Sequence, residues 1–145
     1  MVNLDEVAKK YMKSDNLEAE DVANLLEKLA PFCDWNRFGY VRIKKVGTRE
    51  IPNSDKIRIV LSIRKVGNRL QELQGKGDIT MKPSANTEEL SKMLNLKPTI
   101  INARVSDLRS AGDIKDLKRG EYEVSVFSID ELLEKLLKLI NSKGK

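Results

Sequence analysis

The chain has 145 residues and a formal net charge of +5, enough for one compact domain with a small appendage. With no histidine and only Cys33 as a thiol, the sequence excludes a disulfide framework and a Cys/His zinc cluster, so we expect no metal and no cofactor. No apolar run approaches a membrane span and no signal peptide is apparent, so we expect a cytoplasmic protein without membrane contact. The abundance of lysine, glutamate and isoleucine would suit a thermophile.

The positive charge is concentrated in one part of the chain. Residues 1–30 carry seven acidic and four basic side chains, a net of −3, whereas residues 37–69 carry ten basic and two acidic side chains, a net of +8. A basic block of this kind indicates a surface that faces a polyanion. The cations in it that we expect to add phosphate contacts are Arg58, Arg64, Lys65 and Arg69.

Two amphipathic helices are predicted first, from apolar residues three and four positions apart. The apolar residues of the first extend from Leu4 to Tyr11, and those of the second from Leu17 to Leu29. Pro31 ends the second helix. The aromatic residues Phe32 and Trp35 are expected in the core.

Residues 37–43, RFGYVRI, are predicted to form a strand, because they alternate and are rich in aromatic and β-branched residues. Phe38 and Tyr40 are expected to be half-buried in it. The segment also resembles the aromatic strand of an RNA-recognition motif, whose rings stack on bases, but the rest of that fold does not follow.

Residues 56–74 fit two patterns, since Ile57, Ile59, Leu61 and Ile63 alternate as in a strand while a helical register continues to Leu73. We favour a helix capped by Ser54, although Gly67 weakens it. A turn and a short strand are expected in the stretch GKGDITMKPS that follows, residues 75–84.

The rest of the chain has clearer signals. Asn86 or Thr87 can cap a helix that ends at Asn95, and Pro98 begins another that runs to 111, before Gly112. Strands are predicted at 113–117 and 121–127. A capping box formed by Ser128 and Glu131 is expected to begin the last helix.

The run from Thr87 to Phe127 resembles the winged helix-turn-helix family of DNA-binding proteins, and the similarity reaches residue 55 if the preceding helix is included. In that family the recognition helix carries spaced apolar residues before a glycine. The corresponding residues here are Ile101, Val105, Leu108, Gly112 and Ile114.

The resemblance implies a mostly α fold with a small antiparallel β-wing, an α+β class. The winged helix-turn-helix core would span 53–127, with an N-terminal helical extension and basic strand at 1–52 and a C-terminal helix at 128–145. Shifted by 83 residues, the apolar pattern of the extension matches that of the core, so the extension is also interpreted as a possible degenerate repeat.

Within this arrangement the resemblance puts helix 98–111 in the major groove and makes hairpin 113–127 the wing. The small polar residues on the outer face of the helix, Ser110 among them, would let it approach base edges, and Asn102 could pair with adenine. Asp107 would repel phosphates unless it pairs with Arg104. The residues expected to bind DNA are Lys97, Thr99, Asn102, Ala103, Arg104, Ser106, Arg109, Lys118 and Arg119.

The function expected from these features is sequence-specific binding of double-stranded DNA by a transcriptional regulator. The alternative is a winged-helix protein–protein interaction module in a replication or transcription assembly. We do not expect an enzyme, because the sequence has no phosphate-binding glycine loop, no nucleophile motif and no histidine base.

The C-terminal helix is expected to hold a homodimer. Its apolar residues recur four and three positions apart and exceed what one small core should absorb. The seam consists of Ile129, Leu133, Leu136 and Ile140, widened by Leu132, Leu137 and Leu139. The alternative is that this helix folds back onto its own chain.

Overall fold

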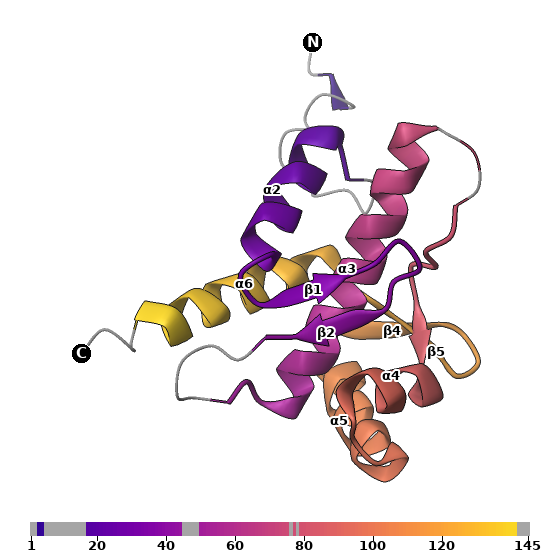
Figure 1. The fold of residues 1–145 in the computed structure, drawn as a ribbon, viewed down its shortest axis with the longest axis vertical. Helices are drawn as coiled ribbons and strands as arrows, with labels where there is room; N and C mark the ends of the chain where they lie inside the picture. Colours follow the sequence, from indigo (N-terminus) through magenta and orange to yellow (C-terminus); the bar gives the residue numbers. More distant parts are fainter. Residues whose placement is uncertain (1–2, 5–16, 45–49, 76, 78, 142–145) are drawn as a thin grey trace.

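The computed structural model of the chain describes residues 3–4, 17–44, 50–75, 77 and 79–141. This part of the protein is mixed α and β, with five helices and two small antiparallel sheets (Figure 1). Most of the first predicted helix lies outside the described residues, so the repeat that depends on it stays a prediction. None of the described helices is both long and apolar enough to cross a membrane.

The longest helix, α3 (Asn53–Gln74), lies at the centre of the fold (Figure 1). Every residue from Ile57 to Gly67 is buried. A helix that is covered on all sides has no polar stripe, which explains why this segment fits the strand period as well as the helix period. The helical interpretation is confirmed. The cap predicted at Ser54 is wrong, because the helix begins directly after Pro52 and no side chain caps it.

The N-terminal part of the described chain packs against α3. Helix α2 (Ala19–Leu29) buries Val22, Leu25 and Leu29 on one face, as its apolar spacing predicts. It leads into a hairpin formed by β1 (Cys33–Trp35) and β2 (Val41–Ile43).

The predicted strand at 37–43 is therefore correct only at its C-terminal end. Residues 36–40 form the turn of the hairpin, and Phe38 and Tyr40 are 55% and 54% exposed, so the prediction that they are half-buried sheet residues is wrong. Phe32 is buried, as expected, and Trp35 is half-buried.

The C-terminal half contains β3 (Ala85–Asn86), α4 (Thr87–Leu94), α5 (Pro98–Ser110), β4 (Ile114–Lys118) and β5 (Glu121–Val124). The three strands form one antiparallel sheet in the order β3-β5-β4. At the start of α4 the Asn86 side chain accepts the Glu89 N–H at 2.8 Å, and the Glu89 carboxylate accepts the Asn86 N–H at 3.2 Å. Asn86 is thus the cap, whereas the strand expected in 75–84 is found later and is only two residues long.

The last helix, α6 (Val126–Asn141), begins earlier than its predicted capping box. The Ser125 hydroxyl accepts the Ser128 N–H at 3.2 Å and so caps the helix. Ser128 is buried in the first turn, where its hydroxyl accepts a hydrogen bond from Arg58 of α3 at 3.2 Å. The prediction of a Ser128–Glu131 box is wrong.

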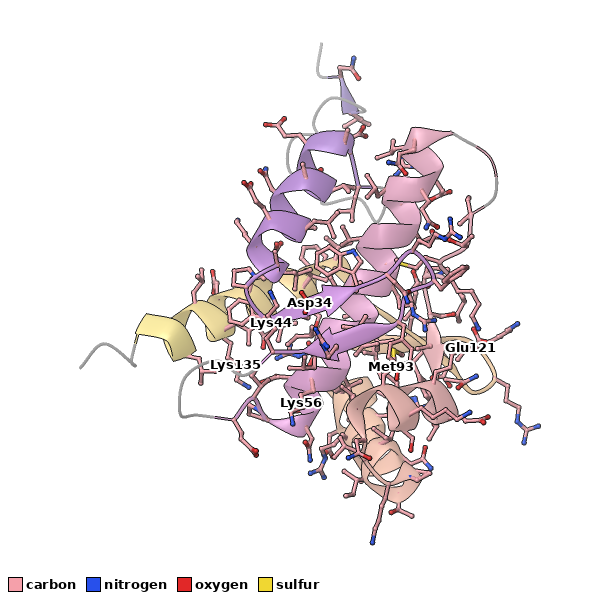
Figure 2. All side chains as sticks on the ribbon, viewed as in Figure 1. Asp34, Lys44, Lys56, Met93, Glu121 and Lys135 are labelled. Atoms are coloured by element: carbon pink, nitrogen blue, oxygen red, sulfur yellow. The ribbon has the colours of Figure 1, made fainter. Side chains whose placement is uncertain are left out.

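Helix α6 packs against α3 of its own chain. An ion cluster around the buried Asp55 of α3 ties the two helices together. Asp55 pairs with the buried Arg58 at 2.9 Å and with the exposed Lys135 of α6, labelled in Figure 2, at 3.1 Å. The apolar side chains buried in this contact include Ile129, Leu132, Leu133 and Leu136.

Most of the predicted dimer seam is consequently part of a single-chain core, so the surplus of apolar surface inferred for α6 is wrong. Leu137 remains 49% exposed and Leu139 is half-buried, while the side chain of Ile140 lies outside the described part. The homodimer itself stays a prediction, without the seam that motivated it.

Candidate nucleic-acid interface

The link between α4 and α5 is short and is held by local contacts. Asn95 ends α4 with a left-handed φ of 55°, a conformation that asparagine tolerates better than most residues. The Ser91 hydroxyl donates to the Leu96 carbonyl at 2.6 Å, and Pro98 then starts α5. The link between α4 and α5 is therefore held by a cap residue, a hydrogen bond and a proline that are close together in the sequence.

One face of α5 is buried, and the predicted outer face is open to solvent. Ile101, Val105 and Leu108 are the buried residues, as their spacing predicts. The exposed predicted site residues of this helix are Thr99, Asn102, Ala103, Ser106 and Arg109, together with Ser110, while Lys97 is exposed just before it and Arg104 is half-buried. The outer surface thus carries small polar groups with basic side chains among them.

Asn102 is tied to the start of α4 by a contact that the sequence did not suggest. The Thr87 hydroxyl donates to Asn102 Oδ1 at 2.9 Å and lies 3.3 Å from the Tyr122 hydroxyl of β5. Because the single Thr87 proton is used on Asn102, the Tyr122 hydroxyl is the donor in the second contact. Thr87 and Tyr122 are thirty-five positions apart in the chain, so no local pattern could reveal the cluster.

Two of the predicted cations on α5 are already paired. Arg104 contacts Asp107 at 3.0 Å, which is the pairing that neutralises the acid on this face. Arg109 contacts Asp116 of β4 at 3.0 Å and lies over the Tyr122 ring, with its guanidinium carbon 5.7 Å from the ring centre. Both ion pairs are exposed, so exchange of a carboxylate for a phosphate would cost little.

The β4–β5 hairpin follows α5 directly in the chain, and β4 packs against α5. Lys118 and Arg119 are exposed at the turn, where Gly120 adopts a φ of 79° that reverses the chain. Lys118 pairs in register with Glu121 across the hairpin, and the ladder shifts between Asp116 and Lys118. No described acid lies within ion-pair distance of Lys118, Arg119 or Lys97, which leaves these three cations available.

Three of the four phosphate contacts expected from α3, those of Arg58, Arg64 and Lys65, are wrong, and that of Arg69 stays a prediction. Arg58, Arg64 and Lys65 are at most 7% exposed and are engaged inside the protein, Lys65 with Glu123 at 2.9 Å. Arg69 is half-buried and donates to the Leu17 carbonyl at 2.7 Å. The basic block of the sequence therefore includes cations that hold the core together.

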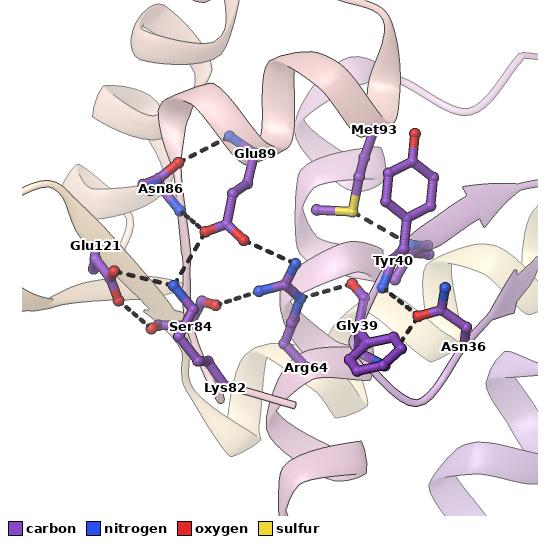
Figure 3. A network of polar contacts seen from close by, with 12 residues as sticks. Asn36, Gly39, Tyr40, Arg64, Lys82, Ser84, Asn86, Glu89, Met93 and Glu121 are labelled. Carbon is purple, nitrogen blue, oxygen red and sulfur yellow. Dashed lines mark hydrogen bonds and ion pairs between the residues drawn. The ribbon is translucent and has the colours of Figure 1, made fainter. Parts of the chain in front are cut away.

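Arg64 connects the N-terminal hairpin to the start of α4 (Figure 3). Its Nε donates to the Gly39 carbonyl at 2.7 Å, its Nη1 to the Ser84 carbonyl at 3.0 Å, and its Nη2 contacts Glu89 at 3.1 Å. Next to this network, Ser84 and Lys82 both bind Glu121, and these contacts lower the pKa of the Glu121 carboxyl, with Ser84 the largest cause.

Comparison with protein-family models, with curated proteins and with solved structures finds no match to this chain. Within the described residues, no group of three or more histidine, cysteine, aspartate or glutamate side chains is arranged to hold a metal ion. The interface is therefore interpreted from its own geometry.

Proposed function

We propose that this chain is a winged helix-turn-helix protein that binds double-stranded DNA in a sequence-specific manner, with α5 in the major groove and the β4–β5 hairpin as the wing. The order α3, β3, α4, α5, β4 and β5, with the sheet order β3-β5-β4, supports the winged-helix assignment. A transcriptional regulator is the role that such binding would serve.

The observation that carries the proposal is the outer face of α5. It is exposed along its length and carries small polar side chains at Thr99, Asn102 and Ser106, with Ile100 37% exposed near its start, so the helix can approach the floor of a major groove. The cation Lys97 precedes the helix, and Lys118 and Arg119 lie at the turn of the wing; all three are exposed and so available to phosphates.

The charge of this surface supports a polyanionic ligand. Residues 97–120 carry six basic and three acidic side chains, a net of +3. One of the acids, Asp113, is only 17% exposed and faces Arg58, so it adds little to the field outside. The paired acids Asp107 and Asp116 hold the cations in place until phosphates replace them.

Selection of bound duplexes from a random pool tests sequence-specific binding directly. If a preferred site emerges, Asn102→Ala should weaken binding to that site by about 1–3 kcal/mol and relax the sequence preference at one position, with nonspecific binding unchanged. Gln74→Ala, which removes an exposed amide at the end of α3, is the control. A pool that returns no enriched sequence would contradict the proposal.

A protein–protein interaction module is the second candidate, favoured by exposed apolar side chains near the wing. Leu117 of β4 is 50% exposed and Phe127 at the start of α6 is 66% exposed. A protein partner would bury such residues, whereas DNA would not. Failure of duplex binding together with a stable complex that is lost in Phe127→Ser would favour this module.

The homodimer belongs to the same proposal, since paired winged helices read paired half-sites. In this fold α6 can offer Leu137 to a second copy without opening the core. Sedimentation of the wild type and of Leu137→Glu measures this: a monomer at micromolar concentration in both would exclude the dimer.

A further inference from the structure

The turn between β1 and β2 exposes aromatic rings that the duplex-binding surface does not use. Phe38 is 55% and Tyr40 54% exposed, although the chain has only seven aromatic residues in all. Large apolar rings are normally withdrawn from water, and two of them exposed within three residues indicate a contact surface. We propose that the 36–40 turn binds single-stranded nucleic acid by stacking unpaired bases on Phe38 and Tyr40.

The turn is held in one conformation by its own hydrogen bonds. Asn36 Oδ1 accepts the N–H of Phe38 at 3.0 Å and the N–H of Tyr40 at 3.1 Å (Figure 3). The Asn36 carbonyl accepts the Gly39 N–H at 3.0 Å. The backbone under both rings is therefore fixed before any ligand arrives. Such preorganisation lowers the entropic cost of binding.

Side chains from outside the hairpin also hold the turn in place. The buried Arg64 donates to the Gly39 carbonyl at 2.7 Å. On the other side of the turn, the Arg37 carbonyl accepts hydrogen bonds from the Thr80 hydroxyl at 2.6 Å and from Gln71 Nε2 at 2.9 Å. Three contacts from outside the hairpin thus fix a turn whose rings remain in solvent.

The charge around the rings suits a phosphate backbone. The Arg37 guanidinium carbon lies 5.0 Å from the centre of the Phe38 ring, so one side of that ring already carries a cation. Arg42 and Lys44 follow on β2 and its end, and both contact the exposed Asp34, whose pKa they lower. With three cations and one acid, the described hairpin region is net positive.

Unpaired bases fit this surface better than a duplex does. In a duplex each base is covered by its neighbours, so rings at a turn find no free base face, whereas in a single strand every base offers one. The cations beside the rings, Arg37, Arg42 and Lys44, can then contact the phosphates of the same strand. This inference goes beyond duplex binding by α5 and does not rest on it, because the residues involved belong to a different part of the chain.

Fluorescence anisotropy of labelled oligo(dT) and oligo(U) in low salt tests the proposal with the full chain. Phe38→Ala and Tyr40→Ala should each weaken single-strand binding roughly 5- to 150-fold, the range of one lost base–aromatic stack. Phe38→Trp and Tyr40→Phe retain a ring and should retain affinity. Both sites are exposed, so circular dichroism should show an unchanged fold in every variant.

Two controls separate this surface from others. Lys118→Ala/Arg119→Ala should leave ring-dependent binding in place, and Phe38→Leu, which keeps apolar area without a π face, should bind as weakly as Phe38→Ala. The DNA and RNA oligomers show whether the sugar is also recognised. Wild type without measurable single-strand affinity, Ala variants equal to wild type, or a fully active Phe38→Leu would each overturn the proposal.

Discussion

The Thr87 hydroxyl donates a hydrogen bond to Asn102 Oδ1 at 2.9 Å and so joins the first residue of α4 to the outer face of α5. Tyr122 of β5 supports the same hydroxyl at 3.3 Å. The carboxamide of Asn102 is therefore oriented by residues from two other elements. A side chain that reads a base benefits from such support, because less freedom is lost on binding.

Thr87→Val removes the hydroxyl while keeping the shape of the side chain. If Asn102 reads a base, loss of its support should weaken binding to the preferred duplex by about 0.5–1.5 kcal/mol, the usual worth of one hydrogen bond. Thr87→Ser retains the hydroxyl and serves as the control. Equal titration curves for Thr87→Val and wild type on the preferred site would show that the Thr87 contact plays no part in recognition.

Lys118 and Arg119 at the wing should act on phosphates without regard to sequence. Changing both to alanine should weaken binding to specific and random duplexes alike and reduce the slope of log affinity against log salt by roughly one to two units. Lys92→Ala is a matched control, because Lys92 is equally basic but is paired with Glu88 at 3.2 Å. An unchanged slope in the double variant would exclude wing contacts.

The sequence predicts the helices best where local signals agree. Helix α5 has apolar residues at regular intervals, a first-turn proline and a following glycine, and all these signals act within the helix itself. The β1–β2 hairpin lacks such signals, because strands of three residues are too short for a period to be read. The sequence therefore predicts its turn as part of a strand.

The buried cations were missed for a different reason. Charged residues are exposed by default, and a buried one is recognisable only when its partners are known. The partners of Arg64 are Gly39, Ser84 and Glu89, which lie 20 to 25 positions away, and the acid that pairs with Lys65 is 58 positions away. Only the folded chain brings these groups together.

Arg64→Met should strongly destabilise the fold. The side chain is 5% exposed and donates to the Gly39 and Ser84 carbonyls, so its loss leaves both carbonyls without this donor and also removes the ion pair with Glu89. We expect a loss of about 3–5 kcal/mol in the free energy of unfolding, measured with urea.

The matched control is Arg42→Ala, which removes an exposed pair with Asp34 and should cost at most about 1 kcal/mol. Similar midpoints for the Arg42 and Arg64 variants would contradict a central role for Arg64. Such a result would also argue against Arg64 as a residue that holds the 36–40 turn in place.

The Cys33 thiol should make stability fall at alkaline pH. Burial, and next the charge of Asp34, raise its pKa from 9.0 to about 12, with Lys44 acting in the opposite direction. Between these two values the unfolded chain has lost the thiol proton and the folded chain retains it, so the unfolded state binds fewer protons and stability decreases as pH rises.

Urea unfolding of the wild type and of Cys33→Ala at about pH 8 and about pH 10.5 isolates this effect from other titrating groups. Wild type should lose more stability than the variant over that interval. A thiol reagent at the lower pH should react slowly with the folded protein and rapidly in urea, because only the thiolate attacks. Parallel losses in the two proteins would contradict the raised pKa.

Gly39 should be far less tolerant of alanine than the glycine of the wing. Both residues have a left-handed φ, 83° at Gly39 and 79° at Gly120, so a side chain is strained at either position. Their surroundings differ, because a Cβ on Gly39 would lie 2.6 Å from Arg64 Cδ and 2.9 Å from Met81 Cγ, whereas nothing lies within 4 Å of one on Gly120.

Gly120→Ala should therefore cost only the backbone strain, about 1–2 kcal/mol, and Gly39→Ala should cost more, because it also displaces the buried Arg64. Urea unfolding of both variants gives the difference. Single-strand binding gives a second measure, since displacement of Arg64 would release the turn that carries Phe38 and Tyr40, while Gly120→Ala should leave that binding intact. Equal losses of stability in the two variants would show that Arg64 moves aside without cost and that the turn does not depend on it.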